Sequence, residues 1–196
     1  HDALPICLIG KNESGKTTFL WALRNLNPAD GLKVDITLDY PRWRKVRDER
    51  DTDISKFDFV EAIFSPTEAE INELSRILGI SIPLSTKLAA KRNYAGCLSI
   101  NFRFQEKDLI QIIVADIQSE IIRNSIRELT TLAEVQTKLK SIQISETKKT
   151  TKLFKEIDKI IAQFDEVKPL LENKTTEQQL SQIINLLPKF FYFSEY

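Results

Sequence analysis

The sequence has no methionine, one histidine and only five glycines among its 196 residues. Because even an initiator methionine is missing and the chain ends just after an apolar run, we interpret it as a fragment of a larger polypeptide. This interpretation includes the possibility that internal segments are missing. We therefore use spacing as evidence within motifs and not between distant segments. The histidine, His1, is terminal, and we assign it no role.

Cysteines and long apolar runs are scarce as well. Cys7 and Cys97 are too few for a disulfide framework, and each lies in an apolar run, which predicts small buried side chains in a reducing cytoplasm. No apolar stretch approaches the roughly 18 residues that a membrane span needs, and no signal-peptide pattern opens the chain. These absences predict a cytoplasmic protein with no membrane segment.

Neither sign of charge is in excess, since 28 basic residues balance 28 acidic ones. A protein that binds nucleic acid over its whole surface is usually basic, so the balance leaves room only for local patches. Apolar residues at 42% and charged residues at 29% are ordinary for a globular protein. The length allows one domain with a core, or a domain with an appendage.

One motif indicates a specific kind of chemistry, the binding of phosphates. Residues 10–17, GKNESGKT, match the pattern G-x-x-x-x-G-K-[ST] in full. Its glycines let the backbone curl so that successive N–H groups face phosphate oxygens, and the following helix points its positive end at the same phosphates. Lys16 would place a positive charge between the β- and γ-phosphates, and the Thr17 hydroxyl would be an oxygen ligand for Mg²⁺.

The motif predicts a site for ATP with Mg²⁺, in which Lys16 is the catalytic residue and Thr17 the metal ligand. GTP is disfavoured because the chain has no N-K-x-D motif for reading guanine. The flanking pattern fits, since an apolar run at 4–9 predicts a buried strand and the apolar spacing of 17–26 predicts a helix. The predicted binding residues are Gly10, Lys11, Asn12, Glu13, Ser14, Gly15, Lys16, Thr17 and Thr18.

Further elements follow along the first half of the chain. Alternation predicts a half-buried strand at 32–38, and the next segment, 42–53, is expected to be a charged loop. A strand is expected at 57–64 and a strand pair within 84–104. Between them, Thr67 and Glu70 form a capping box that predicts a helix ending at Gly79.

From residue 108 onward the apolar residues recur at spacings of three and four, without a single glycine. This pattern predicts a long helical hairpin or coiled-coil arm, through which, or through the preceding lobe, a homodimer could form. Another helix is expected at 175–187 and the start of a strand at 190–193. The predicted organisation is a P-loop lobe at 1–106, a helical insertion at 107–187 and a return strand beginning within 188–196.

The inner residues of the loop, Asn12, Ser14 and Thr18, give the form N-x-S-G-K-T-T. This resembles the loop of the ABC-type ATPases that act on DNA, the SMC/RecF group, and more closely that of the OLD family (overcoming lysogenization defect). Three segments carry the wider likeness: GKNESGKTTFLWALRNLNP at 10–28, DYPR at 39–42 with the strand and capped helix after it, and LPKFFYFSEY at 187–196.

The resemblance implies an α/β fold, a P-loop NTPase lobe of the ABC-ATPase type with a long helical or coiled-coil insertion. It also implies a dimeric AAA ATPase that acts on DNA, in DNA repair or antiviral defence against phage. The ABC signature, the Walker B acid and a metal-dependent Toprim nuclease would then lie beyond Tyr196. We expect this chain alone to bind nucleotide weakly and to hydrolyse it slowly or not at all.

Two alternatives stay open. One is an SMC/RecF-like scaffold, in which nucleotide switches assembly without a nuclease. The other is a small-molecule kinase, which is disfavoured because the helical segment would make a poor arginine-bearing lid. A nuclease would be marked by an acidic Toprim-like cluster in further sequence, and a scaffold by a long heptad arm.

Several weaker candidates have ordinary structural explanations. The run at 112–116, IIVAD, has the shape of a Walker B strand, but the helical period continues through it and favours a helix. LSQ at 180–182 lacks the glycines of an ABC signature, and Gln105 is a weak candidate for a metal-contacting glutamine. Basic residues around Trp43, which are Arg42, Arg44, Lys45, Arg47 and Arg50, suggest a DNA patch, but Asp48, Glu49, Asp51 and Asp53 favour a solvated loop of balanced charge.

Overall fold

The computed structural model describes residues 8–11, 15–31, 33–145, 151–172 and 174–191. Its contacts divide the chain into two compact units, which are treated separately below. Unit 1 comprises residues 1–62, 90–99 and 187–196, and unit 2 comprises residues 63–89 and 100–186. The domain boundaries expected from the sequence remain a prediction. No helix in the described residues is long and apolar enough to cross a membrane.

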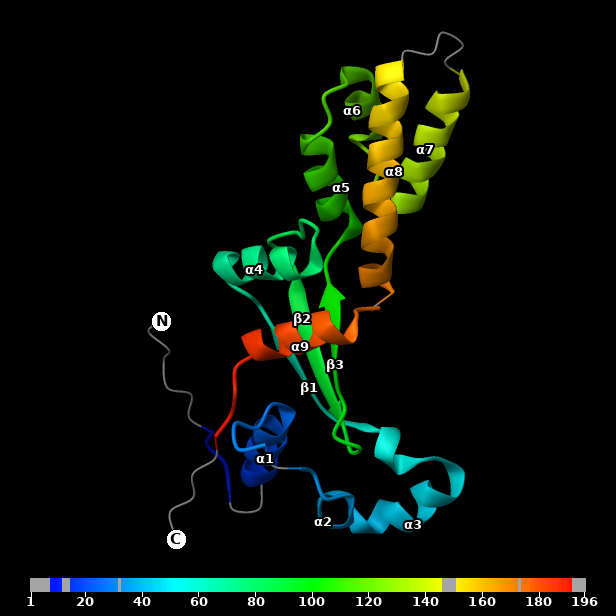
Figure 1. Cartoon of the computed structure of the whole chain (residues 1–196). Coiled ribbons are helices and arrows are strands. Elements are labelled where there is room, and N and C mark those ends of the chain that lie inside the picture. Colours follow the sequence, from blue (N-terminus) through cyan, green and yellow to red (C-terminus); the bar gives the residue numbers. More distant parts are fainter. Residues whose placement is uncertain (1–7, 12–14, 32, 146–150, 173, 192–196) are drawn as a thin grey trace. The chain divides into compact units, whose positions relative to one another are not determined.

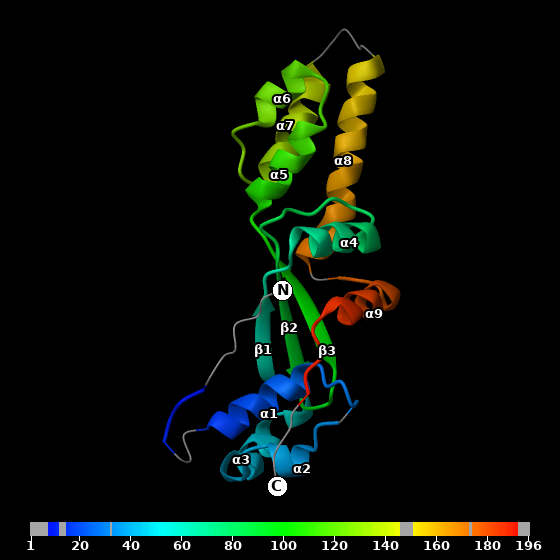
Figure 2. The ribbon, with the colours of Figure 1, turned by 90° about the vertical axis from the view of Figure 1, so that its left-hand side faces the viewer.

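A three-stranded antiparallel sheet contributes residues to both units (Figure 1). Its strands are β1 (Asp58–Phe64), β2 (Lys87–Asn93) and β3 (Leu98–Arg103), in the order β1-β2-β3. Figure 2 shows the three strands side by side. The strand predicted at 57–64 and the pair predicted within 84–104 are therefore confirmed.

The turn between β2 and β3 is closed by local hydrogen bonds. The Asn93 N–H donates to the Cys97 carbonyl at 3.1 Å, and the Asn93 side chain accepts from the Cys97 N–H at 2.9 Å. Gly96 supplies the left-handed backbone of this turn, with φ +84°. Cys97 is exposed, which corrects the prediction of a buried thiol, because it follows the turn rather than lying within a strand.

Unit 1 contains α1 (Lys16–Leu26), α2 (Ile36–Asp39), α3 (Arg42–Asp51) and the short 3₁₀ helix η1 (Ile54–Lys56). The helix predicted at 17–26 is confirmed as α1. The C-terminal end of α1 is held by the rest of the unit. Leu26 is fully buried, and the Arg92 guanidinium donates to its carbonyl at 3.2 Å, which also places a cation at the negative end of the helix.

Two predictions for unit 1 are wrong. The alternating segment 32–38 is not a strand in its described part, because the Asp35 carboxylate accepts from the Thr37 N–H at 2.8 Å and so begins α2 instead. The segment expected to be a charged loop is the helix α3, since Arg44 pairs with Asp48 at 3.0 Å and Lys45 with Glu49 at 3.8 Å, one helical turn apart.

The C-terminal end of the described chain returns to unit 1. Phe190 forms a parallel bridge with Pro28, supported by backbone hydrogen bonds between Phe190 and the neighbours of Pro28, Asn27 and Ala29, at 3.0 and 3.1 Å. The Asn27 side chain also donates to the Pro188 carbonyl at 3.1 Å. The bridge lies where the sequence predicts the start of a strand, whose residues 192 and 193 are outside the described part.

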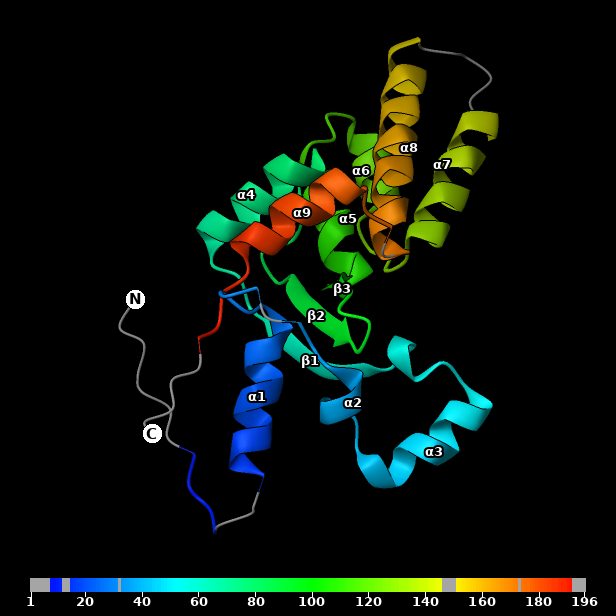
Figure 3. The same ribbon diagram turned by 60° about the horizontal axis from the view of Figure 1, so that its bottom comes forward.

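Unit 2 is mainly helical. The predicted capping box opens α4 (Glu68–Leu78), where the Thr67 hydroxyl accepts from the Glu70 N–H and the Glu70 carboxylate accepts from the Thr67 N–H at 2.7 Å. Gly79 ends this helix in the left-handed conformation, as expected. The last predicted helix is observed as α9 (Glu177–Leu186), which packs against α4 (Figure 3).

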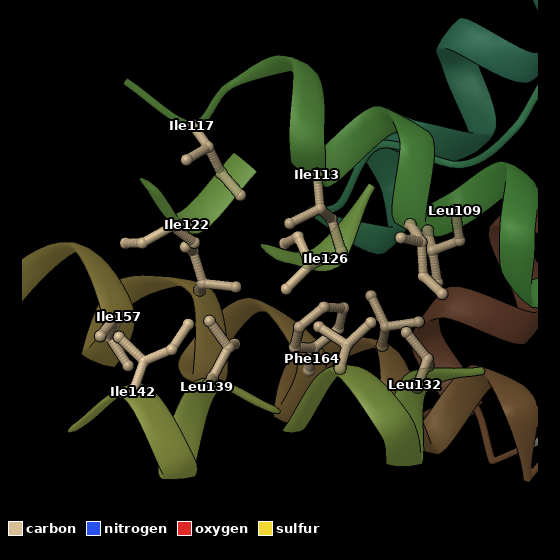
Figure 4. Close-up of a cluster of buried hydrophobic side chains, with 14 residues drawn as sticks. Leu109, Ile113, Ile117, Ile122, Ile126, Leu132, Leu139, Ile142, Ile157 and Phe164 are labelled. Carbon is tan, nitrogen blue, oxygen red and sulfur yellow. The ribbon is translucent and has the colours of Figure 1, made fainter. Parts of the chain in front are cut away.

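Four further helices of unit 2 share one core: α5 (Glu106–Ala115), α6 (Glu120–Ile126), α7 (Leu132–Ser145) and α8 (Thr151–Leu171). Figure 4 shows their aliphatic side chains pointing toward one another around Phe164. In α7, Leu132, Val135, Leu139 and Ile142 are at most 9% exposed, so this stripe serves the core of the chain itself. The prediction of helices from residue 108 onward is confirmed, and α5, α6, α7 and α8 pack together as a bundle.

Candidate phosphate-binding site

Gly15 makes the turn that begins α1. Its backbone has φ +83° and ψ 8°, the left-handed region in which a residue with a Cβ is strained. A Cβ at this position would meet nothing within 4 Å, so the requirement for glycine comes from the backbone angle and not from crowding. The Gly15 carbonyl accepts from the Phe19 N–H at 2.9 Å and so starts the helix directly behind the loop.

The N-cap of α1 is Gly15, which has no side chain to accept from the first N–H groups of the helix. The first turn of α1 contains no acidic residue. In contrast, the first turn of α4 is closed by Thr67 and Glu70. The first N–H groups of a helix have no partner within it and carry partial positive charge, so the start of α1 complements an anion.

Lys16 folds back over the loop. Its ammonium donates to the Gly10 carbonyl at 2.8 Å and to the Lys11 carbonyl at 2.6 Å. This contact brings together the two ends of the motif, Gly10 and the Gly15–Lys16 pair, which are separated by four residues. The ammonium is thereby placed at the loop itself, where the phosphates of a nucleotide would bind.

Thr17 and Thr18 lie in the first turn of α1 and are exposed. The Thr17 hydroxyl is therefore accessible to a cation that bridges it to phosphate oxygens. Among the described residues there is no group of three or more His, Cys, Asp or Glu side chains that could hold a metal ion. The described part of the chain thus offers Mg²⁺ one hydroxyl, and the phosphates would have to supply most of its remaining ligands.

Part of the predicted site lies outside the described residues, namely Asn12, Glu13 and Ser14. Of the strand predicted at 4–9, only Leu8 and Ile9 are described. They have no regular structure and are 40% and 92% exposed, which corrects the prediction of a buried strand for these two residues. A strand needs a neighbour for its backbone hydrogen bonds, and β1, β2 and β3 pair only with one another.

Three of the weaker candidates lie in unit 2, on helices. Residues 112–116 belong to α5 and its C-cap, so the helical interpretation is confirmed and Asp116 is an exposed cap residue. LSQ at 180–182 lies within α9, and Gln105 is the exposed N-cap of α5. None of these geometries is that of a Walker B strand or an ABC signature loop.

Asp48 has a role that the sequence analysis missed. Its carboxylate is buried and accepts from the Tyr40 hydroxyl at 2.6 Å and the Arg44 guanidinium at 3.0 Å. The Tyr40 hydrogen bond holds the pKa of Asp48 below its usual range, an effect assisted by Arg47 and Arg44. The spacing of Arg44 and Asp48, one helical turn, was the available signal, but the sequence analysis treated both as parts of a loop.

Comparison of the whole chain with models of known protein families, with curated proteins and with solved structures finds no match, so the site rests on its own motif and geometry.

Proposed function

We propose that this chain binds ATP with Mg²⁺ through residues 10–18 and is the nucleotide-binding part of a cytoplasmic, OLD-like P-loop ATPase that acts on DNA. The observation that carries the proposal is the position of the Lys16 ammonium, 2.8 Å from the Gly10 carbonyl, beside the start of α1 at Gly15. The complete G-x-x-x-x-G-K-T motif supports the binding of ATP with Mg²⁺. The resemblance to the OLD family supports the choice of family and the action on DNA.

Each residue has a separate task in this proposal. The left-handed turn at Gly15 directs the first N–H groups of α1 toward the phosphates. Lys16 would leave the two carbonyls that it contacts and neutralise charge on the β- and γ-phosphate oxygens. Mg²⁺, when bound, would supply further positive charge against the phosphates, and the Thr17 hydroxyl would be its ligand from this chain.

Hydrolysis by this chain is expected to be slow. Attack on the γ-phosphate needs a residue that positions the attacking water. The Walker B-shaped run at 112–116, which could have supplied an acid for this role, is helical. The chain would therefore bind and hold nucleotide far better than it turns it over.

Unit 2 bears on the choice between an OLD-like ATPase and an SMC-like scaffold. A scaffold arm is a long coiled coil whose apolar seam is covered by the opposing helix alone. Here α5, α6, α7 and α8 cover one another's apolar faces in a closed core. We therefore favour the OLD-like ATPase. Dimerisation remains part of the proposal, but it would use surfaces other than the apolar stripe of α7, which is buried in the chain itself.

The proposal is tested by displacement of a fluorescent ATP analogue in the presence of Mg²⁺. Because the loop contacts phosphates, ATP should displace the analogue and AMP should not, while phosphate release over the same period should be slow. Failure of the chain to bind the analogue, or displacement by AMP as effective as by ATP, would contradict a phosphate-directed site. Rapid phosphate release would contradict the part of the proposal that concerns turnover.

A further inference from the structure

One face of α3 is strongly basic and carries an exposed tryptophan. At about 100° per residue, five of its exposed side chains fall within an arc of about 140° around the helix axis. All five are exposed, and Trp43 and Val46 retain 80% and 64% of their accessible surface. The residues of this face, called the α3 face below, are Arg42, Trp43, Val46, Arg47 and Arg50.

The acidic residues of α3 lie on the remainder of the helix. Asp48 is buried against Tyr40, and Glu49 pairs with Lys45 at 3.8 Å. By the same helical geometry Asp51 falls beyond the edge of the arc. The helix therefore separates charges that balance in the sequence, and the α3 face carries three arginines with no acidic residue among them.

The guanidinium groups of Arg42, Arg47 and Arg50 can still bind an anion from outside the chain. Arg42 and Arg50 form no ion pair with an acidic residue in the described part of the chain. Arg47 donates to Asp48 through Nε at 3.3 Å, yet its side chain remains 70% exposed. An exposed guanidinium binds a phosphate through a planar fork of N–H groups, which a lysine ammonium cannot reproduce.

The helix α3 that carries this face is held in place by contacts of Tyr40. Tyr40, 4% exposed, hydrogen-bonds to Asp48, and its ring lies 5.0 Å from that of Tyr94. The Tyr94 ring in turn lies 5.1 Å from that of Phe59, which belongs to β1. Because these contacts fix the helix before any ligand arrives, binding would not have to order its backbone, and the entropic cost would be that of the exposed side chains alone.

Trp43 indicates which class of ligand the α3 face fits. It stands on the exposed side of α3, with the Arg44 guanidinium 5.7 Å from its ring centre. An exposed aromatic ring among arginines is the arrangement that stacks on an unpaired base while the guanidinium groups bind phosphates. A membrane surface would call for a broader apolar face, and Trp43 and Val46 are the only apolar residues here.

We propose that the α3 face binds single-stranded DNA, with Trp43 stacking on a base and Arg42, Arg47 and Arg50 contacting phosphates. Arg42 and Arg50 are separated by about 12 Å along the helix axis, which spans about three phosphates of a strand. The choice of DNA over RNA rests on the proposed function, whereas the binding surface uses none of the residues of the nucleotide loop.

The test is fluorescence anisotropy of a labelled oligo-dT of about 15 nucleotides, a length that covers the site with margin. The variant R42Q/R50Q should bind at least ten times more weakly than the unmodified chain, and Trp43→Ala about five times more weakly or worse. With three phosphate contacts, log K should fall with log salt at a slope of about −2. In R42Q/R50Q the slope should be less than half as steep.

A matched control removes two positive charges elsewhere. K138Q/K140Q changes two exposed lysines of α7 in unit 2, and it should alter the affinity less than twofold. Circular dichroism should show unchanged helix content in every variant, since all the altered side chains are exposed. Equal effects of R42Q/R50Q and K138Q/K140Q would overturn the proposal, because the attraction would then follow net charge.

Three competing outcomes would also overturn it. An equal affinity for duplex DNA would exclude stacking by Trp43, and tighter binding of an oligo-U of the same length would replace DNA by RNA. Binding to phosphatidylserine vesicles that R42Q/R50Q abolishes, without binding to oligo-dT, would identify a membrane surface. Lys16→Ala separates the two proposals: it should keep DNA binding while losing ATP, so failure of one site leaves the other standing.

Discussion

Gly15 and Lys16 are adjacent in the chain but contribute to the loop in different ways. Gly15 provides a backbone angle, φ +83°, that other residues rarely adopt, and Lys16 provides a charge that reaches back to Gly10. Both contributions follow from the motif, so the sequence alone was enough to locate them. The contact of Lys16 with the Gly10 and Lys11 carbonyls was not predicted, because it depends on the path of the loop backbone.

Gly15→Ala should weaken nucleotide binding. Forcing a Cβ into the left-handed region costs roughly 1–2 kcal/mol, so the loop would relax away from the angle that directs its N–H groups. Gly79→Ala is the matched control, since Gly79 has φ +75° and equally open surroundings but ends α4 in unit 2. Titration of a fluorescent ATP analogue should show a loss for Gly15→Ala only, and urea unfolding should show destabilisation for both.

Asp48 makes stability depend on pH. Because the Tyr40 hydrogen bond lowers the folded-state pKa of Asp48 below its unfolded value, this contribution is present at neutral pH. It is lost as the pH falls from the ordinary aspartate range through the lowered folded value. Asp48→Asn should therefore reduce the thermal midpoint at pH 7, and the difference from the unmodified chain should shrink in acid. A difference that stays constant with pH for Asp48→Asn would contradict the mechanism.

At the scale of single elements, the sequence predicted most accurately where a local signal had no competitor. The capping box at Thr67, the stop at Gly79 and the turn at 93–96 specify their elements through nearby atoms, and all three are observed. Alternation at 32–38 was misleading, because the Asp35 cap competes with strand pairing and the described part of the chain places no partner strand beside this segment. The helix within 42–53 was not predicted, because the balance of its charges suggested a solvated loop and the helical spacing of those charges was not considered.

Thr67→Ala should destabilise the chain through α4. The substitution removes the hydroxyl that accepts from the Glu70 N–H, a loss that costs about 1 kcal/mol at an N-cap. Thr137→Ala is the control, since Thr137 lies within α7 and bonds only back to the Ala133 carbonyl of its own helix. Urea unfolding followed by circular dichroism should show a loss for Thr67→Ala and a change below about 0.5 kcal/mol for Thr137→Ala. Equal losses would mean that the cap does not limit the stability of this region.

At the scale of the whole molecule, the two units have unequal cores. The cluster of unit 2 contains fourteen buried apolar residues from α5 to α8. The buried apolar residues described in unit 1 are Leu26, Tyr40, Ile54, Ala90 and Leu187. Periodicity predicted the helices of unit 2 but not their closure into a bundle, because spacing shows which face is apolar and not which partner covers it. The same limit applies to unit 1, whose large exposed side chains include Ile9, Phe19 and Phe191.

This inequality predicts that the units lose structure separately. Leu139, fully buried in α7, belongs to the core of unit 2, and Leu139→Ala should cost about 2–5 kcal/mol. Calorimetry should show a lower transition that ATP and Mg²⁺ raise, and an upper one that Leu139→Ala lowers. Analogue binding at a temperature below both transitions should be unchanged in Leu139→Ala. A single transition moved by both the nucleotide and the substitution would contradict separate units.

The central claim is that Lys16 serves a working nucleotide site, and isothermal titration of a non-hydrolysable ATP analogue with Mg²⁺ tests it most directly. The unmodified chain should bind the analogue with a stoichiometry near one. Lys16→Ala should abolish binding, and Lys33→Ala, an exposed lysine of unit 1 outside the motif, should leave it intact. Binding that survives Lys16→Ala, or a chain that does not bind the analogue at all, would contradict the account.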